Sequence, residues 1–268
     1  GKNFDLNVTR YTNSQNPVQD RDFYANDEIQ VNLQNASYQT NVWYEKRRGE
    51  FRETPNGVKK IPNLVFANVY LAYHLQDPVS VLKNHNQRFK TEKDLNFISH
   101  KDHKDGLYEK IFNSNTSFED MLCAFYVFDI IFTPLGREYS YAFKTNLYHL
   151  LALFKVAFTK YLTAKYGDKI NVNKQIIKIY EQGDTKVIIK TFTFLNQFVE
   201  KQIEVAENEE KTTERMLKFL FTSSHYQKLY DTLEDTAISI KDIDDIVLKD
   251  DDDIIEGDNN TELTNEQE

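Results

Sequence analysis

Apolar residues recur at helical spacing along most of the chain beyond Pro62. Over residues 64–76 two helix faces satisfy this period: Val65, Val69 and Tyr73, or Phe66, Tyr70 and Tyr73. The same period predicts further helices over residues 78–89, 118–132, 138–166, 171–182, 185–208 and 209–235. Residues 186–198 are rich in Val, Ile, Thr and Phe, so a strand remains an alternative there.

The first sixty residues follow a different pattern. Apolar and polar residues alternate from Phe4 to Tyr11, which predicts a short strand. A helix is expected from Asp27 to Tyr38, capped by Asn26 and with Ile29 and Leu33 facing inward. Val42–Glu45 is predicted to form a second short β segment.

Local signals mark several helix ends. Asp77 is a suitable cap before Pro78, and Ser117 with Asp120 forms a variant of the capping box. Gly167 is a favoured stop residue for the helix over residues 138–166. Residues 91–105 have no period and are predicted to be a loop, and residues 106–112 one or two helical turns.

These patterns predict a mainly α fold with three parts. Residues 1–60 form a small α/β portion that carries most of the motifs, and residues 61–240 form a helical bundle. Residues 241–268 form an acidic tail with too few large apolar residues to fold, so it is expected to be disordered. The 8 glycines and 5 prolines are few for 268 residues, which favours helices.

The negative charge of the chain is concentrated at its end. From Asp242 to Glu268 there are twelve acidic residues and one basic residue, a net charge of −11. Because the whole chain carries −9, the rest has a net charge of +2. An acidic total therefore does not exclude a basic, anion-binding surface on the folded part.

The compartment is predicted to be the cytoplasm. A single cysteine, Cys123, cannot form an internal disulfide, and residues 1–20 lack the apolar core of a signal peptide. The most apolar stretch, residues 147–162, is interrupted by His149, Lys155 and Lys160, so it is expected to be a buried helix. No membrane partner is predicted, and His149 is expected to be a core histidine.

The first candidate site lies between Arg10 and Asn26. Amide, carboxylate and guanidinium groups gather in this polar run, and such groups bind base edges, phosphates or metals. The candidate residues are Asn13, Gln15, Asn16, Arg21, Asp22 and Asn26. The alternative is a hydrogen-bonded loop that caps the following helix.

The second candidate site lies between Val42 and Arg52. Its aromatic rings could stack on bases and its cations could bind phosphates. The candidate residues are Trp43, Tyr44, Lys46, Arg47, Arg48 and Arg52. Residues 46–60 carry a net charge of +4, and the alternative is a solvated hairpin tip or a salt-bridged surface.

The two runs together resemble the AIPR family of abortive-infection phage-resistance proteins. The resemblance rests on Thr12–Pro17, Arg21-Asp22, Asn26-Asp27, Gln30 and Tyr44–Glu50, and continues through His74–Pro78 and Gly106–Phe112. It covers about residues 5–165 and implies bacterial anti-phage defence, often beside restriction-type DNA genes, without an established reaction. The resemblance also implies an upstream half with an Asn-Gly-Gln-Thr-like motif in a ParB-like fold. Because this sequence contains nothing like that motif, the chain is expected to be a carboxy-terminal half.

No metal site is predicted, and no cofactor is assigned. His100 and His103 lie beside aspartates in a loop, but their spacing is not that of a zinc site. Asp20, Asp22 and Glu45 only approximate the paired acids of a metal-dependent nuclease. Lys144 and His149 only approximate an Arg-x4-6-His motif, and phosphate-binding loops and nucleophile elbows are absent.

Three functions remain open at this point. The first is a nucleic-acid-binding defence module in which the two candidate sites contact DNA or RNA. The second is a scaffold that forms homo-oligomers or binds other defence proteins, and the third is a metal-dependent nuclease. The acidic tail is predicted either to lie transiently over the basic residues 46–52 or to serve only solubility.

Overall fold

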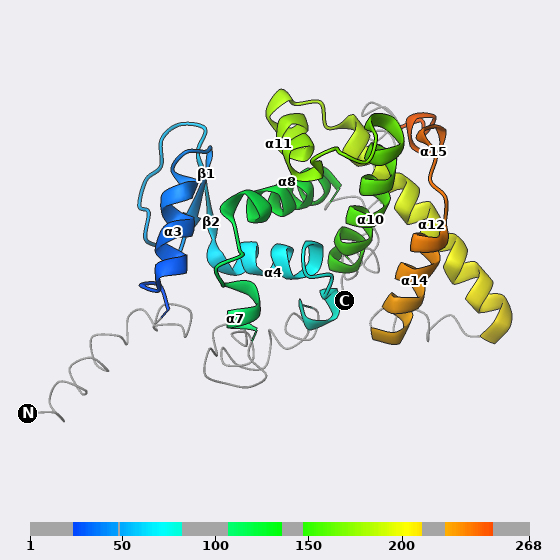
Figure 1. Cartoon of the computed structure of the whole chain (residues 1–268), viewed down its shortest axis with the longest axis horizontal. Helices are drawn as coiled ribbons and strands as arrows, with labels where there is room; N and C mark the ends of the chain where they lie inside the picture. The colour runs from blue at the N-terminus through cyan, green and yellow to red at the C-terminus, as the bar shows by residue number, and fades with distance from the viewer. Residues whose placement is uncertain (1–23, 48, 82–106, 136–146, 211–222, 249–268) are drawn as a thin grey trace, which may run out of the picture.

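A computed structural model describes residues 24–47, 49–81, 107–135, 147–210 and 223–248. This part of the chain is mainly helical with one small sheet, as the hydrophobic pattern predicts (Figure 1). The elements are α3 (Glu28–Ser37), β1 (Val42–Glu45), β2 (Lys59–Pro62), α4 (Asn63–Tyr73), α7 (Tyr108–Ile111), α8 (Phe118–Leu135), α10 (Leu147–Tyr166), α11 (Val172–Gln182), α12 (Lys186–Glu210), α14 (Ser223–Asp235) and α15 (Ile240–Asp244). The strand expected near Phe4 and the loop expected over residues 91–105 lie outside the described residues.

The sheet consists of two parallel strands. β1 has the predicted bounds, whereas β2 was not expected because residues 59–62 are too short and too polar to show a strand period. Val42 pairs with Lys59, and Glu45 pairs with Pro62. Parallel strands require a crossover connection, so residues 46–58 form a crossover and the interpretation of this run as a hairpin tip is wrong.

Helix α4 is the centre of the bundle. It packs against both α8 and α10 and follows β2 directly, so it joins the sheet to the helices (Figure 1). Phe66, Val69, Tyr70, Leu71 and Tyr73 are all buried, so the helix is enclosed on most sides. Both helix faces that the sequence offered as alternatives therefore pack against the core.

Three of the predicted helix ends are confirmed. The Ser117 hydroxyl accepts from the amide of Asp120 at 3.0 Å at the start of α8. The Asp77 carboxylate accepts from the amide of Ser80 at 3.2 Å, at the start of a helical turn that begins at Pro78. Gly167 has φ +86°, the left-handed conformation that ends α10 at low cost.

Residues 186–198 are helical, which excludes the strand alternative. Ile188, Phe192, Leu195 and Val199 are spaced by three or four positions, and all four are buried on one side of α12. Burial of this face outweighs the strand preference of the β-branched residues.

The expected start of the acidic tail is wrong. Residues 240–244 form helix α15, whose Ile243 is fully buried. Ser239 caps this helix: its hydroxyl accepts from the Asp242 amide, and its own amide donates to the Asp242 carboxylate. One large apolar side chain and a capping box thus order a stretch that its acidic composition suggested would not fold. Residues 249–268 lie outside the described residues.

One hydrophobic core runs through the described chain, from Leu33 in α3 to Ile243 in α15. His149 lies within it, as expected for a core histidine. Within the described segments, no helix has both the length and the apolar character needed to cross a membrane.

Candidate nucleic-acid interface

Only part of each predicted site lies among the described residues. Those outside are Asn13, Gln15, Asn16, Arg21, Asp22 and Arg48. Those inside are Asn26, Trp43, Tyr44, Lys46, Arg47 and Arg52, which lie before α3, on β1 and on the crossover that follows it. The fold therefore brings the end of the first run beside the second, but the structure divides these residues into internal and exposed sets.

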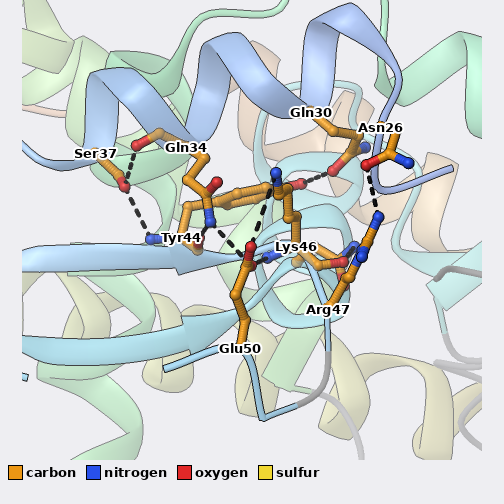
Figure 2. A network of polar contacts seen from close by, with 9 residues as sticks. Asn26, Gln30, Gln34, Ser37, Tyr44, Lys46, Arg47 and Glu50 are labelled. Atoms are coloured by element: carbon orange, nitrogen blue, oxygen red, sulfur yellow. Dashed lines mark hydrogen bonds and ion pairs between the residues drawn. The ribbon is translucent and has the colours of Figure 1, made fainter. Parts of the chain in front are cut away.

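Tyr44 belongs to the internal set. Its side chain is fully buried between α3 and α4, and its hydroxyl donates to Gln30 Oε1 at 2.5 Å (Figure 2). Its amide donates to the Ser37 hydroxyl at 3.0 Å, and Gln34 Nε2 lies 3.4 Å from its carbonyl oxygen. A ring enclosed in this way has no free face, so the prediction that Tyr44 stacks on a base is wrong.

The internal network continues from Gln30 to helix α7. Gln30 Nε2 donates to the Tyr108 hydroxyl at 3.4 Å, and that hydroxyl donates to Asp27 Oδ2 at 2.9 Å. Burial raises the pKa of Tyr108, which keeps the hydroxyl protonated as a donor. Asp27, rather than the expected Asn26, is the N-cap residue of α3, and its carboxylate is directed to Tyr108 instead of to the helix amides.

Glu50 neutralises and positions the start of the crossover. Its Oε2 accepts from Gln34 Nε2 at 2.9 Å and from the Lys46 amide at 3.2 Å (Figure 2). The Lys46 ammonium lies 3.7 Å from Glu50 Oε1, and the Lys59 ammonium lies 2.7 Å from Asp129 Oδ2. At Lys46 and Lys59 the structure therefore agrees with the alternative prediction of a salt-bridged surface.

Three other cations remain on the surface. Arg47 donates from Nη2 to Asn26 Oδ1 at 2.6 Å, which ties the crossover to the start of α3. Lys60 donates from Nζ to the Phe51 carbonyl oxygen at 2.8 Å. Arg47, Arg52 and Lys60 are exposed, and among the described residues no ion pair joins any of them to a carboxylate. Their positive charge is therefore available to an anion.

An aromatic patch of Tyr38, Trp43 and Phe51 lies beside these cations. The Trp43 ring centroid is 5.2 Å from that of Tyr38 and 5.2 Å from that of Phe51, and the Tyr38 ring is 44% exposed. Trp43 pairs with Lys60 across the sheet. The sequence reasoning singled out Trp43 but not Tyr38 or Phe51, whose nearness depends on the ends of α3 and of the crossover meeting in space.

Nothing in the described segments forms a metal centre. No group of three or more His, Cys, Asp or Glu side chains is placed to hold an ion there. Asp20, Asp22, His100 and His103 lie outside the described residues, and Glu45 is buried. The proposed nuclease acids therefore stay a prediction.

The His74–Pro78 motif supports the bundle. His74 Nε2 donates to the Asp120 carbonyl oxygen at 2.8 Å, and burial together with nearby Lys155 lowers the pKa of His74 to about 4. Gln76, at φ +55°, donates to the carbonyl oxygens of Tyr73 and Ala152. These contacts join α4 to α8 and α10.

Cys123 lies close to the same junction. Its thiol donates to Asn173 Oδ1 at 3.4 Å, and burial strongly raises its pKa. The thiol therefore stays protonated at neutral pH and is a poor nucleophile.

A protein-family model described as "AIPR protein" matches residues 2–213. The match includes α3, both strands, the exposed cations and the aromatic patch, and it ends just after α12. Comparison with curated proteins and with solved structures gives no significant match.

Proposed function

Because the chain belongs to the AIPR family, whose name denotes abortive-infection phage resistance, we propose that it serves this defence by binding nucleic acid. Membership of the family suggests the phage-resistance role. The binding role is supported by one observation: Arg47, Arg52 and Lys60 are exposed on one crossover and the strand after it.

Cations in this arrangement suit a phosphate backbone. Guanidinium groups bind phosphate oxygens through two parallel hydrogen bonds, and each neutralised phosphate releases a condensed counterion. Three contacts should make the logarithm of the binding constant fall with the logarithm of salt concentration, with a slope of roughly −2 on a single strand.

The test is a titration of labelled nucleic acid with the full chain over a series of salt concentrations. The variant R47Q/R52Q/K60Q should bind weakly and lose most of the salt dependence. The matched control K169Q/K174Q/K178Q removes the same charge from exposed lysines in and before α11 and should bind as the parent does. No binding by the parent chain at low salt would refute the proposal.

A second candidate function is a scaffold that binds another copy of the chain or another defence protein. It is favoured by a second aromatic surface, where Phe128 stacks on Phe132 at 5.2 Å and on Tyr148 at 5.9 Å. Phe132 is 49% exposed. Light scattering across a concentration series tests for self-association. A concentration-dependent oligomer that Phe132→Ser converts to a monomer supports self-assembly. A strict monomer argues against it.

A further inference from the structure

The three rings of the aromatic patch meet mainly by their edges. Tyr38 makes angles of 83° with Trp43 and 78° with Phe51. By contrast, the internal pair Tyr126 and Tyr180 stacks at 3.6 Å and 6°. An edge-to-face contact leaves the faces of the ring that presents its edge uncovered by that partner. Together with the exposure of Tyr38, this geometry leaves aromatic surface that a planar ligand can cover.

The charges around the patch suit an anion. Lys60 is held against Phe51 by its hydrogen bond to that residue's carbonyl oxygen and pairs with Trp43 across the sheet, while Arg52 follows Phe51 in the chain. Of the two acids in residues 50–53, Glu50 is paired with the Lys46 ammonium and accepts a hydrogen bond from Gln34, while Glu53 is exposed. The positive charges of Arg47, Arg52 and Lys60 therefore outnumber the negative charge of Glu53.

We infer that the aromatic patch stacks on unpaired bases of single-stranded nucleic acid while the adjoining cations bind its phosphates. This inference rests on the proposed function and deepens it by naming the ligand class. Single strands present base faces to aromatic side chains, whereas the bases of a duplex are already stacked on one another. Phosphates and bases alternate along a single strand, which matches a patch with cations beside it.

The chain provides its own probe, because Trp43 is its single tryptophan. The experiment titrates the full chain with oligothymidylate, oligouridylate, a duplex of equal length and an abasic oligonucleotide of equal length. Both oligopyrimidines should quench the fluorescence of Trp43 as they bind. The duplex and the abasic strand should bind more weakly and leave the fluorescence nearly unchanged.

Substitution of an exposed ring separates stacking from charge. Tyr38→Leu should weaken binding of the oligopyrimidines by roughly 5-fold to 100-fold, the usual effect of losing one stacked base. It should change binding of the abasic strand little. The matched control is Tyr166→Leu, which removes an aromatic ring that is 56% exposed at the end of α10, far from the sheet (Figure 1), and should leave binding unchanged.

The outcomes distinguish this inference from the proposed function. Equal affinity for all four probes without quenching would overturn the stacking inference and leave the binding proposal standing. Absence of binding by every probe at low salt would overturn both. Equal weakening by Tyr38→Leu and Tyr166→Leu would also count against stacking. A preference between the two oligopyrimidines supports the inference and reflects the sugar, the thymine methyl group or both.

Discussion

At the residue scale, buried polar side chains hold α3 on the sheet. Gln30, Gln34 and Ser37 form the inward face of α3, together with Leu33. Such groups stabilise a core only when each one has a partner, and here Tyr44, Glu50 and Tyr108 supply the partners. Several residues of the motif that resembles a binding site therefore stabilise the packing of α3 on the sheet instead.

The hydroxyl of Tyr44 should be measurable as a stabilising group. Tyr44→Phe leaves Gln30 Oε1 without this buried donor and should lower the free energy of unfolding by about 1–3 kcal/mol. Tyr38→Phe removes a hydroxyl from a ring that is 44% exposed and should change it by less than about 0.5 kcal/mol. Urea unfolding of both variants measures the difference, and equal effects would contradict the internal role of Tyr44.

A buried histidine should make the protein sensitive to mild acid. Burial lowers the pKa of His149 from 6.5 to about 4. Between these values the unfolded chain binds a proton that the folded chain does not, so stability falls as pH falls from about 6.5 towards 4. The contribution of His149 should be a loss of about 2 kcal/mol between about pH 7 and about pH 5.

Urea unfolding of the parent chain and of His149→Leu at these two pH values tests this expectation. The variant should lose less stability than the parent does on acidification. Part of the loss should remain, because the pKa of His74 is lowered in the same direction. Identical losses in the two proteins would show that His149 does not contribute.

At the element scale, the end of the described chain is held on α10 and α12 by both charge and burial. Lys160 donates to the carbonyl oxygens of Leu233 and Thr236 at 3.0 Å, where α14 ends. Asp244 accepts from the Tyr161 hydroxyl at 2.6 Å and pairs with Lys165 at 3.1 Å. Exposed ion pairs contribute little, so the buried side chain of α15 should dominate its stability.

Ile243 is that side chain, and Val247 is its exposed counterpart in the same segment. Ile243→Ala should lower the free energy of unfolding by about 2–5 kcal/mol, because the cavity adds to the lost burial. Val247 is 88% exposed, so Val247→Ala should change it by less than about 0.5 kcal/mol. Urea unfolding and hydrogen exchange of residues 240–248 measure both. Similar effects would mean that α15 is not docked as described.

At the scale of the whole molecule, the charge is distributed unequally between the ends of the chain. Residues 249–268 contain nine acidic residues and one basic residue, whereas Arg47, Arg52 and Lys60 are exposed near the sheet. A polyanionic segment in the same molecule can compete with nucleic acid for these cations, and at physiological salt this attraction should be screened beyond about 8 Å.

Truncation after Leu248 tests this competition while leaving α15 in place. The shortened chain should bind nucleic acid more tightly at low salt, and the gain should shrink as salt rises. A truncation at Ile240 would confuse the result because it removes the buried Ile243. Unchanged affinity at every salt concentration would leave the acidic segment with a role in solubility alone.

Most of the helices could be predicted from local pattern alone. The period of apolar residues predicted α4, α8, α11 and α12, and the capping signals at Ser117 and Gly167 predicted the start of α8 and the end of α10. Such features depend on residues three or four positions apart, so a short stretch of sequence contains the necessary information. The family resemblance was also readable, because its motifs lie in order along the chain.

Tertiary structure decided which motif residues are exposed. Tyr44 and Trp43 are neighbours in the sequence, yet β1 directs the first into the core and the second to the partly exposed aromatic patch. The charge of Lys46 is neutralised because Glu50, which accepts a hydrogen bond from Gln34, lies beside it. The aromatic patch forms because Tyr38 and Phe51, which belong to different segments, come into contact. Whether a side chain is exposed for binding depends on how distant segments pack against it. The local spacing of apolar and polar residues contains no information on that packing.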